Sequence, residues 1–149
     1  MSVSGLTVRK MKKEDLDRVS QIEKECFSTP WSRDAFEDMI DNPLALYMVA
    51  EDNGYVVANC GVISAVGEGD ICNVAVDPAY RKRGIGEKLL SEIMNVASKE
   101  LLVEAFTLEV RASNKAAISL YEKLGFVNEG IRPGFYTSPK EDAVIFWKR

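Results

Sequence analysis

The chain has 149 residues, of which 46% are hydrophobic and 28% charged, so residues 1–149 have the length and composition of a single globular domain. It contains no histidine, which excludes Ser-His-Asp hydrolysis, Cys-His proteolysis and the usual zinc sites. A net charge of −4 offers no general basic surface for nucleic acid, so we expect any anion site to be local.

Two helices are predicted after a short first strand. Apolar residues at 6–8 indicate the strand, and apolar residues at steps of three and four over 16–26 predict the first helix. Ser32 is placed to cap a second helix, with Trp31 before it and Phe36 inside it as a hydrophobic staple. An aromatic loop therefore separates the two helices.

Residues 44–76 predict three antiparallel strands, because their apolar, β-branched runs are separated by turn residues at 52–54 and 67–69. After this meander the apolar spacing over 85–97 becomes helical, and a further strand follows at 106–111. A strand, a helix and a second strand in succession predict a right-handed parallel crossover.

The last third of the chain predicts one helix and two strands. Ser113 or Asn114 is positioned to cap the helix, and Gly125 to end it in the left-handed conformation. A strand that opens at 126–127 is expected to pair with 143–147 across the loop that holds Pro133 to Pro139. The expected fold is α/β, with a mixed, mostly antiparallel central sheet of about seven strands, four helices and one parallel β-α-β crossover.

A basic segment with two glycines, Arg81-Lys82-Arg83-Gly84-Ile85-Gly86, lies between a predicted strand and a predicted helix. Backbone N–H groups are unpaired at a helix N-terminus, and the helix dipole is positive there. The glycines let the backbone approach a phosphate, and three successive cations concentrate positive charge. The segment therefore predicts a pyrophosphate site, although it matches neither the Rossmann fingerprint nor the P-loop. The alternative is a solvated basic turn.

The glycine segment belongs to an ordered series of motifs. Arg81-x-x-Gly84-x-Gly86 follows Asn73-Val74-Ala75-Val76-Asp77-Pro78 and precedes Leu108-Glu109-Val110-Arg111-Ala112-Ser113-Asn114 and Leu120-Tyr121-x-x-Leu124-Gly125-Phe126. From the loop at 27–31 to the last strand, the chain resembles the GCN5-related N-acetyltransferases (GNAT), and within them the RimI type. The resemblance implies the GNAT fold and transfer of acetyl from acetyl-CoA to a protein N-terminal α-amine. In the RimI type that amine belongs to the N-terminal alanine of a ribosomal protein.

Two residues are candidates for proton transfer. Glu109 shares one face of its strand with Thr107 and Arg111, opposite the apolar residues, which suggests a cleft. The resemblance implies that Glu109 is the base, directly or through water, and that the Tyr121 hydroxyl protonates the coenzyme A sulfur. A phenol is protonated at neutral pH, as an acid must be. The alternatives are a carboxylate paired with a neighbouring Arg or Lys and an ordinary core tyrosine.

The resemblance also implies the residues that bind the two substrates. Those expected to bind acetyl-CoA are Val74, Ala75, Val76, Arg81, Lys82, Arg83, Gly84, Ile85, Gly86, Glu87 and Asn114. Phe27, Trp31 and Tyr136 are expected around the peptide, and Phe135 stands where the family often has a second tyrosine. An N-terminal amine, with a pKa near 7.7 to 8.0 against about 10.4 for lysine, suits a single Glu acting through water.

Two other functions stay open, namely acetylation of a small amine and non-enzymatic binding of acyl-CoA. A pure binding module needs neither Glu109 nor Tyr121, which disfavours the second. The three cysteines lack metal or redox spacing, so we expect reduced thiols without a chemical role and no metal. With no secretory pattern and no apolar run of membrane-spanning length, we expect a cytoplasmic monomer or weak oligomer without membrane or direct nucleic-acid binding.

Overall fold

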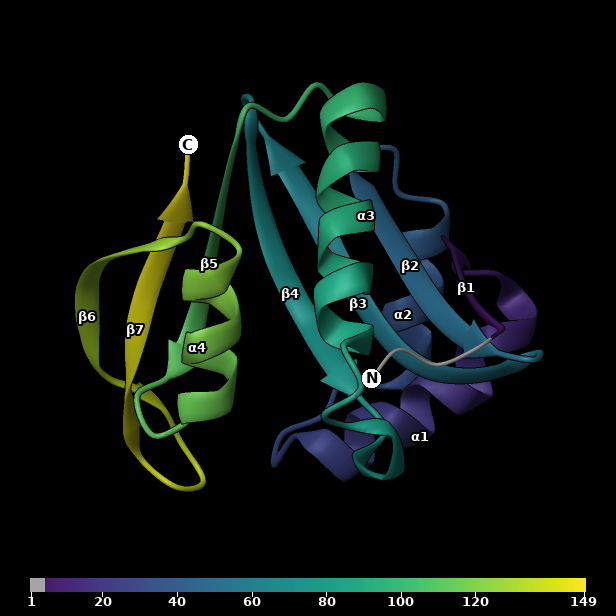
Figure 1. The fold of residues 1–149 in the computed structure, drawn as a ribbon, viewed down its shortest axis with the longest axis horizontal. Helices are drawn as coiled ribbons and strands as arrows, with labels where there is room; N and C mark the ends of the chain where they lie inside the picture. Colours follow the sequence, from purple (N-terminus) through teal and green to yellow (C-terminus); the bar gives the residue numbers. More distant parts are fainter. Residues whose placement is uncertain (1–4) are drawn as a thin grey trace.

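The computed structural model describes residues 5–149 and contains a seven-stranded sheet with the order β1-β2-β3-β4-β5-β7-β6 (Figure 1). The first four residues of the predicted domain lie outside the described residues. The strands are β1 (Leu6–Lys10), β2 (Ala45–Asp52), β3 (Tyr55–Ala65), β4 (Glu68–Val76), β5 (Ala105–Arg111), β6 (Val127–Tyr136) and β7 (Glu141–Lys148). The helices are α1 (Leu16–Cys26), α2 (Arg33–Ile40), α3 (Ile85–Glu100) and α4 (Lys115–Lys123), with short 3-10 turns at Lys13–Asp15 and Pro78–Tyr80. The predicted α/β fold is confirmed.

Only one pair of neighbouring strands among the described residues is parallel. β4 and β5 are joined through α3, and their ladder contains three pairs that run from Glu68–Ala105 to Asp70–Thr107. All other pairs are antiparallel, so the predicted mixed sheet and parallel crossover are confirmed. Beyond this short ladder β4 and β5 diverge, as Figure 1 shows. The sheet is thereby divided into β1–β4 and β5–β7.

The helices cover both faces of the sheet. α3 and α4 lie in front of it in Figure 1, while α1 and α2 lie behind it. β2 shows why the sequence allows this, since Leu46 and Met48 pack in the cluster under α3 while Tyr47 and Val49 pack under α1 and α2. A strand buried on both faces reads as a continuous apolar run, and the sequence has such a run here.

The predicted helix ends are confirmed. The Ser32 hydroxyl accepts a hydrogen bond from Ala35 N–H, and the Asn114 side chain accepts one from Ala117 N–H, both at 3.2 Å. Asn114 rather than Ser113 is therefore the cap of α4. Gly125 follows α4 with a φ of 95°, the left-handed conformation that glycine adopts without steric cost.

Two predicted turns were misplaced. The β3–β4 turn is formed by Val66 and Gly67, both with positive φ, so that Glu68 and Gly69 belong to β4 rather than to the turn. A valine rarely adopts this conformation, so no local pattern indicates a turn at this position. The second error concerns Pro133, which lies inside β6 and not in a loop. β6 is an edge strand with a register shift between Arg132 and Tyr136, where proline is tolerated.

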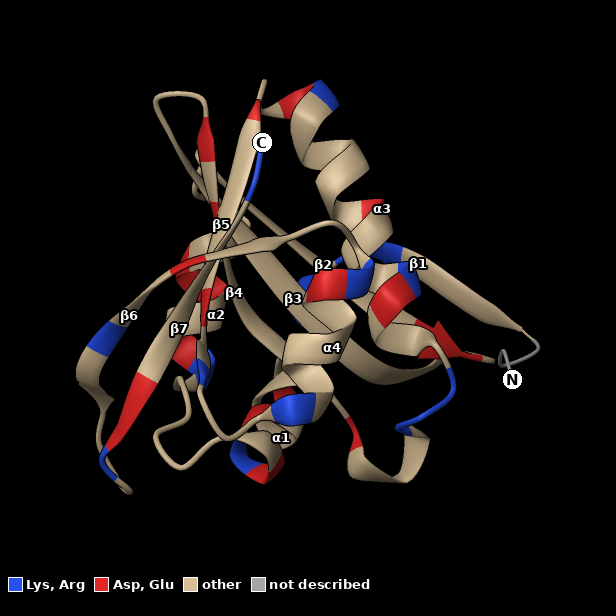
Figure 2. Ribbon diagram, turned by 60° about the vertical axis from the view of Figure 1, so that its left-hand side comes forward, with Lys and Arg blue, Asp and Glu red and all other residues tan. Residues whose placement is uncertain are grey.

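The sequence also led to predictions about the cysteine thiols, the distribution of charged residues and membrane-spanning segments. Cys26, Cys60 and Cys72 are free thiols. In Figure 2 the Lys and Arg segments and the Asp and Glu segments are both spread over several helices, strands and loops of the ribbon. Over residues 5–149, no helix has both the length and the apolar character needed to cross a membrane.

Candidate active site

Glu109 lies on β5 in the position that strand alternation predicted. Phe106, Leu108 and Val110 are buried, and the polar residues between them are half-buried. The Glu109 side chain is 25% exposed and lines a pocket of about 370 Å³. The other residues that line this pocket are Ile63, Ala65, Glu68, Asp70, Thr107, Glu129, Arg132, Ile145 and Trp147. The polar face of β5 therefore borders a cavity, as expected.

The charges around Glu109 come from three strands. Arg132 on β6 places its Nε 3.1 Å from Glu109 Oε2, and the pair attracts by charge without a hydrogen bond. Desolvation and the negative charge of Glu109 raise the pKa of Asp70 on β4, while Arg132 opposes this shift. The expected alternative of an Arg-paired carboxylate is thus present in the structure. The pair leaves Glu109 in the pocket, where a substrate amine can reach it.

Tyr136 lies close enough to interact with Glu109. Burial and the negative charge of Glu109 raise the pKa of the Tyr136 phenol, and Arg111 opposes the shift. The Arg111 guanidinium stacks over the Tyr136 ring at 4.5 Å. The structure therefore brings together a predicted catalytic residue and a predicted peptide contact that are far apart in the sequence.

Tyr121 lies on the opposite face of β5. Its ring is buried 5.9 Å from Phe126 and 6.1 Å from Phe146, in the cluster under α3 and α4. Burial raises the pKa of its phenol, with smaller contributions from Cys60 and Tyr136. A substrate can meet both Glu109 and Tyr121 only through the sheet, and β4 and β5 diverge beyond Asp70. If both residues act on one substrate, that substrate must lie in the space between β4 and β5.

The β4 backbone fits an extended ligand with amide groups. The ladder with β5 ends at Asp70, so Val74–Val76 lie beyond it. Backbone N–H and C=O groups at such an edge seek partners, and the pantetheine arm of coenzyme A carries amides that can pair with them. The predicted role of this segment is therefore compatible with the sheet topology.

The N-terminus of α3 has the properties of an anion site. Gly84 has a φ of 76°, and the first bond of the helix runs from Lys88 N–H to Gly84 O at 3.1 Å. The N–H groups of 85–87 therefore have no acceptor within the helix. A Cβ at Gly84 would meet no described atom within 4 Å, and Lys82 and Arg83 beside it are exposed. Unpaired N–H groups, open space and two cations fit a pyrophosphate.

Other predicted acetyl-CoA residues have partners within the protein. Arg81 donates to Val76 O at 3.2 Å and to Cys26 Sγ at 3.3 Å, which ties the segment to β4 and α1. Glu87 pairs with Lys123 at 3.0 Å between α3 and α4. A Cβ at Gly86 would lie 3.4 Å from Leu120, so this glycine permits close packing of α4. Asn114 is the cap already described.

The other two predicted peptide contacts lie on the α1–α2 loop. Phe27 is 38% exposed, while Trp31 is half-buried with its ring 5.4 Å from Phe36 and 6.0 Å from Tyr47. Neither is among the residues that line the Glu109 pocket. Trp31 therefore acts as the predicted staple, and its contact with a peptide stays a prediction.

Sequence reasoning missed three charged residues near these positions. Arg132 and Asp70 accompany Glu109, and Glu23 is buried beside the α1–α2 loop. A signal for Glu23 existed, because it falls at helical spacing from Val19 and Cys26 on the apolar face of α1. Arg132 gave no comparable signal, since its position depends on a register shift in β6.

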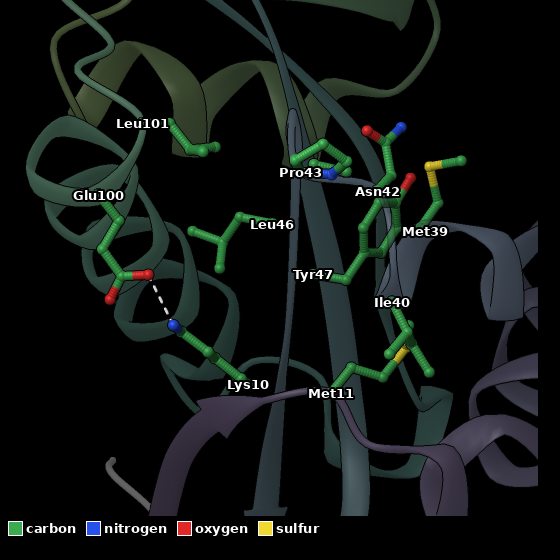
Figure 3. Close-up of a pocket in the computed structure, with 11 residues that line it drawn as sticks. Lys10, Met11, Met39, Ile40, Asn42, Pro43, Leu46, Tyr47, Glu100 and Leu101 are labelled. Carbon is green, nitrogen blue, oxygen red and sulfur yellow. Dashed lines mark hydrogen bonds and ion pairs between the residues drawn. The ribbon is translucent and has the colours of Figure 1, made fainter.

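A second pocket, of about 340 Å³, lies near the end of β1, the start of β2, the end of α2 and the end of α3 (Figure 3). Lys10 and Glu100 form an ion pair of 2.6 Å at its border. None of the predicted site residues is among those lining it. The pocket beside Glu109 is therefore the candidate active site.

The sequence profile described as "Acetyltransferase (GNAT) family" matches residues 16–126. This range contains the β4 segment, the N-terminus of α3, Glu109 and Tyr121. The chain belongs to the GNAT acetyltransferase family.

Individual relatives resemble the chain over most of its length. A Bacillus subtilis protein provisionally named [ribosomal protein bS18]-alanine N-acetyltransferase is 39% identical over 141 residues, which cover 94% of this chain and 93% of that protein. The crystal structure of the ribosomal-protein-S18-alanine N-acetyltransferase from Escherichia coli has 35% identity and a TM-score of 0.85, covering 95% of this chain and 92% of that one. Arabidopsis thaliana NAA60 in complex with acetyl-CoA shares the fold, with a TM-score of 0.84 at 21% identity over 96% and 98% of the two chains.

Proposed function

We propose that the protein transfers the acetyl group of acetyl-CoA to the N-terminal α-amine of a protein, with the N-terminal alanine of a ribosomal protein as its target. The observation that carries this proposal is Glu109, a pocket-lining carboxylate beside the end of the β4–β5 ladder. The relatives named for alanine N-acetylation, similar over nine tenths of the chain, support the choice of substrate.

Glu109 and Tyr121 share the proton transfers in this reaction. The Glu109 carboxylate takes a proton from the substrate ammonium, directly or through water, which leaves a neutral amine. The amine nitrogen then bonds to the thioester carbonyl carbon, and the carbon–sulfur bond breaks. The second proton that the nitrogen loses on becoming an amide passes to water, from which Tyr121 is reprotonated after it has protonated the thiolate. The departing thiolate takes its proton from the Tyr121 hydroxyl, whose raised pKa keeps it protonated at neutral pH. The scheme uses no metal ion.

Acetyl-CoA is held by the segments described above. The β4 backbone at Val74–Val76 pairs with the pantetheine arm, and the N-terminus of α3 with Lys82 and Arg83 binds the pyrophosphate. Arg81, Glu87 and Asn114 complete the predicted set at the ends of the neighbouring elements. Phe27, Trp31 and Tyr136 surround the first residues of the peptide. We place the activity in the cytoplasm and expect a monomer or weak oligomer.

The substrate class is tested by locating the acetyl group on model peptides. The purified protein is incubated with acetyl-CoA and a peptide that begins Ala-Arg and contains an internal lysine, next to the same peptide with a blocked N-terminus. Mass spectrometry should find acetylation of the free α-amine alone, because its pKa lies more than two units below that of lysine. Acetylation of lysine, or acetyl-CoA binding without any peptide product, would contradict the proposal.

A further inference from the structure

Glu23 is a buried carboxylate without an ion-pair partner among the described residues. The residue is 2% exposed, and no cation pairs with it among residues 5–149. Oε2 accepts hydrogen bonds from Trp31 N–H at 3.2 Å and from Asn73 Nδ2 at 3.1 Å, while Oε1 has no partner. Burial raises the pKa of this carboxyl group, and the two hydrogen bonds oppose the shift. Burying a carboxylate without a counter-ion is costly, so its position requires an explanation.

Asn73, one of the two donors, forms a bulge in β4. Its φ of 55° is left-handed, and the β3–β4 register shifts at this point between Asn59 and Gly61. All polar groups of its side chain are engaged, since Nδ2 donates to Glu23 and Oδ1 accepts from the Tyr47 hydroxyl at 2.8 Å. Its carbonyl accepts from Asn59 Nδ2 at 2.9 Å. Side chains from α1, β2 and β3 therefore hold the bulge in its left-handed conformation.

Tyr47 reaches Asn73 because the strand beside it leaves room. A Cβ at Gly61 would lie 2.2 Å from the Tyr47 ring, so only glycine allows the ring to cross β3 at this level. The hydroxyl then lies 3.2 Å from Cys72 Sγ as well as against Asn73. The Trp31 ring packs on the other side of Tyr47 at 6.0 Å. The contacts thus link the α1–α2 loop to the β4 bulge through both backbone and aromatic packing.

We propose that Glu23 is a positioning residue for acetyl transfer. One of its two carboxylate oxygens, Oε2, holds two segments that lie on different sides of the predicted active site. Through Trp31 N–H it holds the α1–α2 loop, which is the predicted peptide contact. Through Asn73 it holds the bulge directly before Val74–Val76, the predicted acetyl-CoA contact. The inference rests on the proposed function for its meaning, while the hydrogen bonds themselves can be tested without any substrate.

A purely stabilising role does not account for this arrangement. An apolar side chain of similar size at position 23 would fill the same space without the cost of burying a carboxylate. What it could not do is accept from two donors that belong to different segments. The carboxylate therefore contributes relative position rather than stability, and its removal should change catalysis more than folding.

The test compares two replacements of Glu23 with a control on the same helix. Glu23→Gln keeps an acceptor oxygen, Glu23→Met keeps the volume but accepts nothing, and Val19→Ala alters a fully buried residue of α1 outside these contacts. For each variant we would measure kcat, the KM of the Ala-Arg peptide and the KM of acetyl-CoA. NMR hydrogen exchange at the Trp31 amide would report the loop contact without substrate.

Glu23→Met should raise the peptide KM about tenfold, lower kcat severalfold and speed exchange at the Trp31 amide, because a hydrogen bond to a buried carboxylate has a free energy of this order. Glu23→Gln should restore both values to within about threefold of wild type, a rescue expected because the acceptor is retained. Val19→Ala should leave both KM values unchanged. Equal kinetics and equal Trp31 exchange in Glu23→Met and Val19→Ala would overturn the inference.

Two further outcomes separate this inference from the proposed function. If the wild type acetylates no N-terminal amine, the proposed function fails, and unchanged Trp31 exchange in Glu23→Met would then reject the loop contact independently. If Glu23→Met does not fold, Tyr47→Phe removes the hydrogen bond to Asn73 while keeping the ring. Tyr47→Phe should lower kcat at an unchanged peptide KM, and a wild-type kcat would reject the role of the bulge.

Discussion

Glu109 combines three properties that a base for an ammonium substrate needs, namely a negative charge, access to a pocket and a neighbouring cation that a substrate can replace. Arg132 Nε lies 3.1 Å from its carboxylate, and the Arg132 side chain is 58% exposed. Because the Arg132 side chain is mostly exposed, it can move away from Glu109 when an ammonium group enters the pocket, since ion pairs at the protein surface have free energies of only about 0 to 1 kcal/mol.

Replacing Glu109 by Gln should remove this base and leave the cavity shape intact. We expect kcat to fall by about 100-fold to 10,000-fold, the usual contribution of a general base, with little change in the Kd of acetyl-CoA. Glu129→Gln is the control, because Glu129 borders the same pocket but pairs with Arg149. Steady-state kinetics and calorimetric titration measure the two quantities, and a Glu109→Gln rate near that of the control would reject the assignment.

Replacing Tyr121 by Phe removes the hydroxyl and keeps the aromatic ring, so the variant tests the hydroxyl alone. The contacts of the ring with Phe126 and Phe146 persist in the variant, so the free energy of unfolding should change by less than about 1 kcal/mol. We expect kcat to fall by at least about tenfold because thiolate departure loses its proton donor.

The pH dependence provides an independent check on Tyr121. Burial raises the pKa of this phenol, so the donor keeps its proton through neutral and moderately alkaline pH. The kcat of the wild type should therefore show no alkaline decline up to about pH 10, the ordinary pKa of tyrosine. A decline centred near pH 8 or 9 would show that another group donates the proton.

At the residue scale, the sequence predicted what depends on strand and helix periodicity. Alternation along 106–111 was enough to place Glu109 on a polar face bordering a pocket. It could not predict the pairing with Arg132, which requires the register of β6 against β7. Glu23 was overlooked because a carboxylate on an apolar helix face is usually solvated at the edge, whereas here two donors from distant segments bury it.

At the scale of the elements, the positive charges at the N-terminus of α3 can be tested for their contribution to acetyl-CoA binding. Lys82 and Arg83 are exposed, and Gly84 leaves open space before the helix. Replacing both cations by Ala should raise the Kd of acetyl-CoA roughly fivefold for each charge, about 1 kcal/mol per contact. Because salt screens exposed charges, the wild type should lose more affinity than the double variant between 50 and 500 mM salt.

The control for this prediction removes one positive charge at the opposite end of α3, and its effect is compared with the effect per charge in the double variant. Lys99 lies in the last turn of α3, far from Gly84, and its replacement by Ala should leave the Kd unchanged. Isothermal titration at two salt concentrations measures each variant. An equal effect of Lys99→Ala would indicate a general electrostatic attraction rather than a phosphate site.

Element boundaries were predictable where side-chain chemistry fixes them. Ser32 and Asn114 cap their helices with the bonds that their residue types suggest. The β3–β4 turn was predicted at the glycines of 67–69, because glycine is the usual turn residue. The turn instead begins at Val66, which adopts a positive φ that valine rarely takes. Such a turn is imposed by the pairing of β3 with β4, a tertiary effect absent from local sequence.

At the scale of the whole molecule, the sequence predicted the strands and helices but not the division of the sheet. The β4–β5 ladder stops at Asp70, and the register shift that accompanies Asn73 lies just beyond it. Neither event has a local signal, since Asn73 lies inside β4 and its side chain is held by Glu23 and Tyr47, which are distant in the sequence. The motifs that resemble the GNAT family indicate the division of the sheet only through the fold that the resemblance implies.

This division of the sheet makes ligand binding a test of the whole architecture. The predicted contacts of acetyl-CoA lie on β4 and α3 on one side, and at Asn114 and Tyr121 on the other. A ligand that binds only the folded protein stabilises it by RT ln(1 + [L]/Kd), about 2.7 kcal/mol at 100 times the Kd. For a chain of this length we expect the Tm to rise by about 5 to 10 °C.

Amide hydrogen exchange shows whether the ligand joins both halves. Bound acetyl-CoA should slow exchange at the N-termini of both α3 and α4 and along Val74–Val76, because the contacts lie on both sides of the β4–β5 divergence. In the Lys82→Ala and Arg83→Ala double variant, the rise in Tm at the same ligand concentration should shrink in proportion to the logarithm of the increased Kd. Protection confined to β4 and α3 would place the ligand on one half alone, and the catalytic role of Tyr121 would then be untenable because its hydroxyl belongs to the other half.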